Sequence, residues 1–140
     1  MTLTMDSILS LPKIGYGNFR DVYRLGGVVY KVENVDGMDF NSNRNEYNNY
    51  LTLLTRKLPT GIVLPMMDLI VVEGLNVVLS EYIDGKLVGE CFCLPGEPHY
   101  GCIPPGMERD LNALGIDVAY GNIILKDSTY YLIDLDADLV

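Results

Sequence analysis

Short apolar runs that end at glycines dominate the first part of the chain. Five of them, rich in Val, Ile, Leu and Tyr, cover residues 11–16, 19–25, 28–33, 62–72 and 75–82. Gly26-Gly27 and Glu73-Gly74 separate neighbouring runs, as the tight turns of β-hairpins do. We therefore expect an α+β protein in which these runs form an antiparallel five-stranded sheet.

One longer segment, residues 41–57, has apolar residues at the spacing of an amphipathic helix. The buried stripe that this spacing predicts consists of Tyr47, Tyr50, Leu51, Leu54 and Leu58. Pro59 and Gly61 follow directly and are typical of a helix end. One helix is therefore expected to pack on the sheet.

The second part of the chain has weaker patterns. Residues 84–105 contain four glycines and four prolines, so we expect no regular structure there. A short helix is predicted over residues 107–114. A small hairpin is predicted from strands at 122–125 and 130–135, which flank Asp127-Ser128.

The composition supports a folded protein and narrows its class. Apolar residues make up 49% of the 140 residues, enough for a core in one domain or two small lobes. The formal charge of −9 argues against a nucleic-acid partner, because an acidic protein repels phosphate backbones. Polar residues interrupt the long apolar stretches, and the N-terminus lacks a basic signal region. The number of cysteines is odd, three, which argues against a disulfide framework. From these three features together we expect a cytoplasmic protein that does not bind membranes.

Lys31 lies within an apolar strand and has two possible roles. Strand alternation places it on the face opposite Tyr30 and Val32. A lysine in such a strand either protects a sheet edge or binds phosphate, and the residue alone favours the edge. Glu46, in the predicted helix, either pairs with Lys31 or forms a capping box with Asn43.

Three polar residues precede or interrupt apolar strands in the second part. Asn122 follows Asp117 by five residues and leads into an apolar strand, while Asp134 interrupts the end of the next strand. A carboxylate there is costly unless something compensates its charge. Asn and Asp oxygens at adjacent strand ends are ligands that suit Mg²⁺.

Taken in order, these features resemble the protein-kinase-like fold, which also contains the aminoglycoside phosphotransferases. Residues 14–23 are similar to its glycine-rich loop, 29–32 to its lysine-bearing strand and 78–85 to its hinge. Residues 117–122 have the spacing of its catalytic loop, and 133–136 are similar to its metal-binding motif. The chain is most similar to the very short kinase-like proteins predicted in bacteriophage genomes.

The resemblance implies two lobes. Residues 1–83 form a kinase-like N-lobe, and residues 84–140 form a strongly truncated C-lobe. That C-lobe contains a Cys/His-rich segment, 91–102, and a catalytic-loop-like hairpin, 115–136. The nucleotide is expected in the cleft between the lobes.

The resemblance also implies a role for each candidate residue. Gly15 and Gly17 let backbone amides approach the nucleotide phosphates, although two such glycines alone are more typical of a plain hairpin. Lys31, oriented by Glu46, holds the α- and β-phosphates of ATP, and the backbone of Glu81 receives adenine. Asn122 and Asp134 hold Mg²⁺, with Asp136 as a possible second metal contact, and Asp117 orients the attacking hydroxyl.

The expected activity is transfer of the γ-phosphoryl group of ATP to a hydroxyl on a Ser/Thr side chain or small molecule. The chain departs from the family pattern, since Arg20 replaces the third glycine, Gly115 replaces a histidine and Asp136 replaces a glycine. The small substrate lobe and the charge of −9, which could attract a basic partner, support an alternative. The alternative is a catalytically inactive pseudokinase-like phage protein that binds and inhibits a host protein in the host cytoplasm. A third interpretation is a small α+β domain whose motif matches are accidental.

The cysteines and the single histidine are clustered. Cys91, Cys93, His99 and Cys102 could supply the three thiolates and one imidazole of a closed structural Zn²⁺ site. Their spacing is tighter than in standard zinc motifs. Buried apolar thiols beside a solvated histidine are an equally good interpretation, and a Cys–His nucleophile pair has no supporting motif.

Overall fold

The computed structural model describes residues 3–15, 20–33, 42–89, 94, 96, 102–118, 122–135 and 139. The chain divides into two units. The first unit comprises Met1–Asn48 and Pro65–Tyr82, and the second comprises Asn49–Leu64 and Ile83–Val140. Helix α2 (Ser42–Leu54) contributes residues to both.

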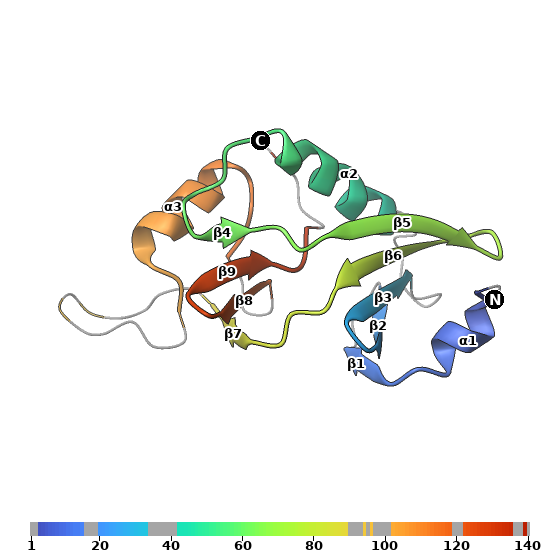
Figure 1. The fold of residues 1–140 in the computed structure, drawn as a ribbon. Coiled ribbons are helices and arrows are strands. Elements are labelled where there is room, and N and C mark those ends of the chain that lie inside the picture. Colours follow the sequence, from blue (N-terminus) through green and yellow to red (C-terminus); the bar gives the residue numbers. More distant parts are fainter. Residues whose placement is uncertain are drawn as a thin grey trace. The chain divides into compact units, whose positions relative to one another are not determined.

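The first unit is built on the antiparallel five-stranded sheet that the sequence predicts (Figure 1). In sheet order its strands are β1 (Lys13–Gly15), β2 (Arg20–Leu25), β3 (Val28–Glu33), β6 (Leu75–Glu81) and β5 (Met67–Val72). Two-residue turns join β2 to β3 and β5 to β6. Glu73 and Gly74 both have positive φ, 51° and 81°, which matches the right-handed twist of the flanking strands.

The two faces of this sheet are covered differently. Helix α1 (Met5–Leu9), which the sequence analysis does not predict, packs Met5 and Ile8 onto one face. Its apolar core partners in the sheet are Tyr23, Tyr30, Val32, Val72 and Val77. This confirms that Tyr30 and Val32 share one face, which leaves Lys31 on the other.

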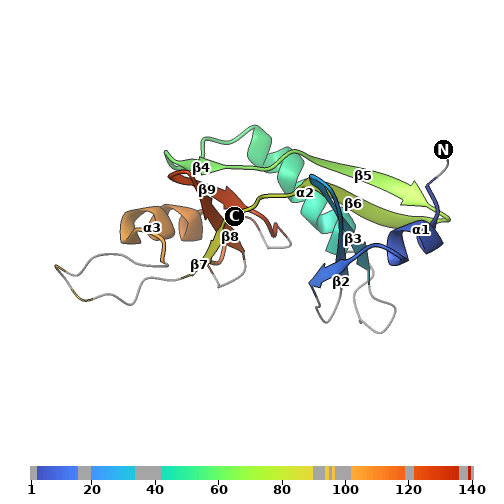
Figure 2. The same ribbon diagram turned by 60° about the horizontal axis from the view of Figure 1, so that its bottom comes forward.

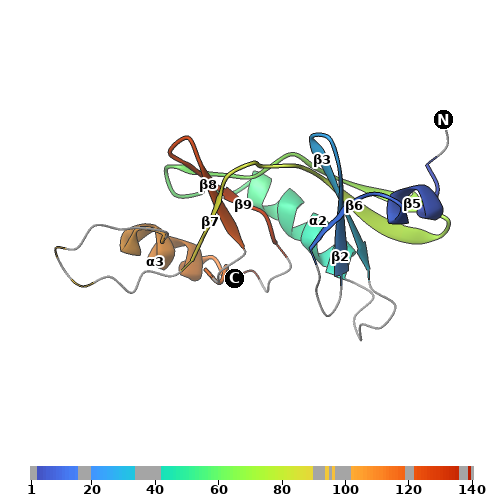
Figure 3. The ribbon, with the colours of Figure 1, turned by 90° about the horizontal axis from the view of Figure 1, so that it is seen from below.

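Helix α2 covers that other face with its first turns, beside β3 (Figure 3). The predicted buried stripe is wrong for Leu51 and Leu54, which are 45% and 56% exposed. Its other members, Tyr47, Tyr50 and Leu58, are half-buried. The side chains that α2 buries are those of Ser42, Asn43, Glu46 and Leu53. Polar bonds from Asn43 and Glu46 to the sheet fix the rotation of this helix, so its pattern of leucines misleads.

The predicted strand 62–72 is in fact two strands in different sheets. Strand β4 (Ile62–Val63) pairs with a strand of the second unit, whereas β5 begins only at Met67. Pro65, between them, has no N–H to give to a ladder of hydrogen bonds. The apolar run therefore continues through a break that hydropathy alone does not reveal.

The second unit contains a four-stranded sheet (Figure 2). In sheet order its strands are β4, β9 (Thr129–Leu132), β8 (Ile123–Lys126) and β7 (Lys86–Val88). The predicted hairpin is present as β8 and β9, with Asp127 and Ser128 at positive φ in its turn. Strand β7 corrects the expectation that residues 84–105 lack regular structure; its three residues are too few to show a pattern.

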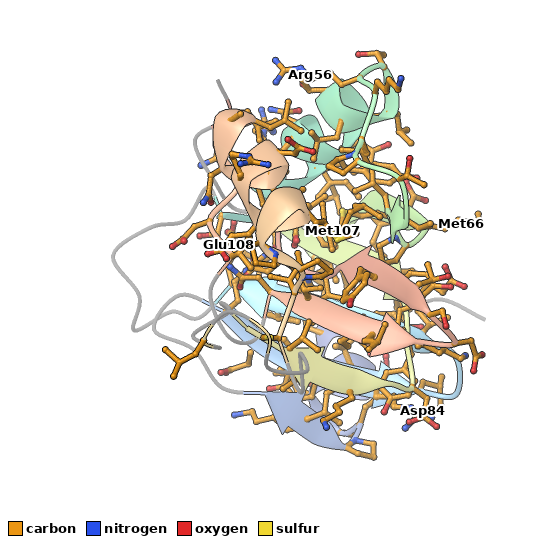
Figure 4. The ribbon with its side chains drawn as sticks, turned by 90° about the vertical axis from the view of Figure 1, so that its left-hand side faces the viewer. Arg56, Met66, Asp84, Met107 and Glu108 are labelled. Carbon is orange, nitrogen blue, oxygen red and sulfur yellow. The ribbon has the colours of Figure 1, made fainter. Side chains whose placement is uncertain are left out.

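Helix α3 (Pro105–Ala113) accounts for the short helix predicted at 107–114. Figure 4 labels two of its residues, Met107 and Glu108. A Cβ placed on Gly61, just before β4, would lie 3.4 Å from Met107 Cε, so this methionine covers the start of β4. In the part of the chain that the structure describes, no helix is long and apolar enough to cross a membrane.

Candidate functional site

Lys31 and Glu46 form a buried ion pair in the first unit. Lys31 Nζ lies 2.9 Å from both carboxylate oxygens of Glu46. Glu46 is fully buried and Lys31 is 7% exposed. The geometry is that of a charge-assisted pair in which the carboxylate orients the ammonium.

The edge interpretation of Lys31 is wrong. Strand β3 is the third of five in the sheet and pairs with β2 on one side and β6 on the other. A lysine there protects no exposed edge. Its burial must instead be compensated by charged and polar partners.

The capping-box alternative for Glu46 is also wrong. Helix α2 begins at Ser42, which makes Asn43 its second residue rather than its N-cap. The Asn43 side chain donates to the carbonyl oxygens of Lys31 (2.9 Å) and Asn76 (2.8 Å), and its backbone N–H donates to Glu33 Oε1 (3.0 Å). Asn43 thus fastens the start of α2 to β3 and β6.

Arg20 is a member of this cluster that the sequence analysis does not identify. Its Nη1 donates to Glu46 Oε1 at 2.5 Å and to Asn43 Oδ1 at 3.4 Å, and its side chain is 11% exposed. The strand register contains the signal: Val22 is opposite Lys31, so Arg20, two residues earlier, shares its face. From the sequence alone, Arg20 is only a residue that replaces a glycine of the expected loop pattern. Its role in the cluster becomes evident only when the strand register is known.

The buried carboxylate of Glu46 therefore receives hydrogen bonds from two cations. An unpaired carboxylate in this position would cost several kcal/mol of desolvation. Bonds from Lys31 and Arg20 offset that cost and hold both cations against the first turns of α2. Of the two roles that the sequence offers for Glu46, the structure thus shows the one in which it pairs with Lys31.

The glycine-rich segment is only partly described. Gly15 is the last residue of β1 and lies opposite Val22, where the register of β1 and β2 shifts. A Cβ on Gly15 would lie 3.4 Å from Val22 Cβ, so the strands approach closely there. Gly17 lies outside the described residues.

Glu81, the hinge candidate, ends β6. Its backbone N–H donates to Met66 O at 3.0 Å, and its carboxylate accepts from Met66 N at 3.3 Å. The next amide, Tyr82 N–H, donates to Gly27 O at 2.8 Å. A base bound at Glu81 would therefore have to use its carbonyl oxygen rather than its N–H.

Asp117, Asn122 and Asp134 all belong to the second unit, where the backbone brings them to one end of the β8–β9 hairpin. Asn122 Nδ2 donates to Asp117 O at 3.2 Å. Across the hairpin, Ile133 N donates to Asn122 O at 2.9 Å, which places Asp134 one residue beyond this pair. Asp117 itself is exposed between buried Ile116 and Val118.

Asn49 is a second residue that the sequence analysis does not identify. Its Nδ2 donates to Leu135 O at 2.5 Å, and Leu135 is itself buried. This bond from the later turns of α2 holds the backbone directly after Asp134. Asp136 lies outside the described residues.

Asn122 and Asp134 suit a hard cation by their chemistry. The side-chain amide of Asn122 donates through Nδ2 to Asp117 O, so its Oδ1 is the atom that could bind a metal ion. Mg²⁺ prefers carboxylate and amide oxygens as ligands. Among the described residues, no group of three or more His, Cys, Asp or Glu side chains could hold a metal ion. A magnesium site here would depend on two protein oxygens together with phosphate oxygens.

Cys91, Cys93 and His99, the other members of the candidate zinc set, lie outside the described residues. Cys102 is buried and forms a β-bridge with Gly89, so the two ends of the intervening segment meet. Partial burial and the nearby Cys102 thiol raise the pKa of Tyr130 above its ordinary value of 10. The zinc hypothesis stays a prediction.

Comparisons with known proteins add no family assignment. No protein-family model matches the sequence, and no curated protein matches it.

Proposed function

We propose that the protein binds ATP with Mg²⁺ through a minimal kinase-like fold and transfers the γ-phosphoryl group to a hydroxyl acceptor. The observation that carries this proposal is the buried pair between Lys31 on β3 and Glu46 on α2. A fully buried carboxylate that holds a lysine by both oxygens is costly to maintain as a mere structural contact. It is well suited to keeping an ammonium in place for a polyphosphate.

Lys31 would bind the α- and β-phosphates and neutralise part of their charge. Gly15, at the end of β1, would let the backbone approach the phosphates. Phosphoryl transfer requires little covalent chemistry from a protein. Its catalysis therefore comes mainly from positioning of the reactants and neutralisation of the phosphate charge.

The second unit would supply the remaining groups. Asn122 and Asp134 would hold Mg²⁺, which would neutralise part of the phosphate charge. Asp117 would orient the acceptor hydroxyl and take its proton. The acceptor oxygen then forms a bond to the γ-phosphorus while the bond from that phosphorus to the β,γ-bridging oxygen breaks, and ADP leaves.

The test is ATP turnover with Mg²⁺, measured as ADP formation and as transfer of labelled phosphate to the protein itself or to a hydroxyl acceptor. Turnover should disappear in Asp117→Ala. Asp110→Ala, which changes another exposed aspartate of the second unit on α3, is the matched control and should keep the wild-type rate.

Absence of turnover in the folded wild-type protein would contradict the proposal. Tight capture of a single host protein by that same inactive protein would favour the alternative, an inhibitor that uses a kinase-like fold. Turnover that persists in Asp117→Ala would remove this aspartate from the mechanism.

A further inference from the structure

Two cations share one carboxylate oxygen in the first unit. Glu46 Oε1 accepts from Lys31 Nζ at 2.9 Å and from Arg20 Nη1 at 2.5 Å, and Oε2 accepts from Lys31 Nζ at 2.9 Å. The arginine is fixed in this position from a second side, because it also donates to Asn43 Oδ1. Like charges this close repel each other in a poorly solvated site.

We infer that Arg20 is a positioning residue for Lys31. Arg20 competes with Lys31 for Glu46 and thereby weakens the hold of that carboxylate on the lysine ammonium. Removal of the Arg20 charge should bind Lys31 more tightly to Glu46. Its presence leaves the ammonium readier to turn towards an anionic ligand. The identity of that ligand as a nucleotide polyphosphate rests on the proposed function.

The surroundings of Lys31 support this division of roles. Among the described residues, the charged side chains that this face of the sheet carries beside Lys31 are those of Arg20, Arg24 and Glu33. Helix α2 adds Glu46 and the buried amide of Asn43. Glu33 accepts the Asn43 backbone N–H and lies opposite Arg20 in the strand register. Arg24 lies at the far end of β2, with its guanidinium 3.6 Å from the Tyr82 ring centre, and donates to Gly26 O.

The experiment is competitive acetylation of the full-length protein near pH 8 without nucleotide, with the modification of each lysine measured by mass spectrometry. Arg20→Met removes the second cation from Glu46, so the carboxylate should hold the Lys31 ammonium more tightly. Lys31 should therefore react about fivefold to tenfold more slowly than in the wild type, relative to Lys86. Arg20→Lys keeps the charge and should restore the wild-type reactivity.

Arg24→Met is the matched control, because it removes the same side chain from the same strand without touching Glu46. It should leave the reactivity of Lys31 unchanged. A purely structural role for Arg20 predicts the opposite sign, since a loosened cluster would expose Lys31 and speed its acetylation. A faster or unchanged reaction of Lys31 in Arg20→Met would therefore overturn the inference.

Arg20→Gln replaces Arg20→Met if the latter does not fold, with the same expected slowing. Failure of both variants to fold would assign Arg20 to stability alone and would also overturn the inference. If the slowing is observed but the wild-type protein binds no ATP, the proposed function fails while the role of Arg20 stands.

Discussion

Glu46 is the residue on which the first unit depends most, because a charged group with no exposure to water has to be compensated by its neighbours. Lys31 and Arg20 donate to it directly, and Asn43 holds its helix against the sheet. These four side chains come from β2, β3 and α2. They therefore tie the helix to two strands through one carboxylate.

Glu46→Gln should lower the free energy of unfolding by about 3–5 kcal/mol, because it leaves Lys31 and Arg20 buried beside a neutral amide. Urea unfolding measures this. Glu73→Gln, the same substitution at an exposed turn, is the control and should change stability by less than about 0.5 kcal/mol. Equal effects of the two substitutions would show that the buried pair is not formed in solution.

Tyr130 provides a prediction at alkaline pH. Its pKa is raised, first by burial and second by Cys102, so the folded state keeps the phenol proton where an unfolded chain would lose it. The free energy of unfolding should therefore fall as the pH rises past about 10. Tyrosinate absorbance should show that Cys102→Ser moves the pKa of Tyr130 back towards 10. An unchanged titration in Cys102→Ser would exclude the thiol as a cause.

At the scale of elements, α2 shows how a polar contact can override a hydrophobic pattern. Helical spacing predicts burial of Leu51 and Leu54, yet the helix turns its Asn43 and Glu46 side to the sheet. Single-sequence patterns weigh each apolar residue alike. They contain no information on the bonds of the Glu46 carboxylate to Lys31 and Arg20, which determine the rotation of the helix.

Two adjacent leucines of α2 test this rotation. Leu53→Ala should destabilise the protein by about 2–5 kcal/mol, because Leu53 is 1% exposed and its loss leaves a cavity. Leu54→Ala, at the 56% exposed neighbour, should change the unfolding free energy by less than about 0.5 kcal/mol. A larger destabilisation by Leu54→Ala than by Leu53→Ala, in thermal or urea unfolding, would instead support the rotation that the leucine pattern predicts.

Gly85 is the position where the second unit has no room for a side chain. A Cβ there would lie 2.5 Å from Leu125 O and 2.6 Å from Ile124 Cγ2. Gly85→Ala should therefore cost about 1–3 kcal/mol, because it pushes the chain before β7 away from β8. Gly106→Ala, near the start of α3, where a Cβ would lie 3.7 Å from Arg109 Nη2 in ordinary contact, should be neutral or stabilise by up to about 1 kcal/mol. Similar unfolding midpoints for both variants would contradict the close approach at Gly85.

The sequence predicts some elements of this fold much better than others. The paired runs of β2–β3, β5–β6 and β8–β9 are recognisable because turn residues such as Glu73-Gly74 mark their ends. Helix α1 and strand β7 are too short to carry a periodic signal. The break at Pro65 is missed because the apolar run continues on both sides of it.

At the scale of the whole molecule, the candidate residues fall into two sets that follow the two units. Lys31 and Glu46 belong to the first, and Asp117, Asn122 and Asp134 to the second. The sequence points to these residues through the resemblance to the kinase-like fold, because their order and spacing match its motifs. Arg20, Asn43 and Asn49 are missed because their roles depend on register and on hydrogen bonds between distant segments.

The central claim is that the protein binds ATP with Mg²⁺ and that Lys31 and Asp134 are each needed for this binding. Calorimetric titration of ATP with excess Mg²⁺ tests it most directly, in the wild type, Lys31→Met, Asp134→Asn and Asp127→Asn. The last variant makes the same substitution at the opposite end of the β8–β9 hairpin, where Asn also tolerates positive φ. We predict binding with a dissociation constant on the order of micromolar in the wild type and Asp127→Asn, and its loss in the other two. Absence of binding to the folded wild-type protein, or equal binding by Asp134→Asn, would contradict the account.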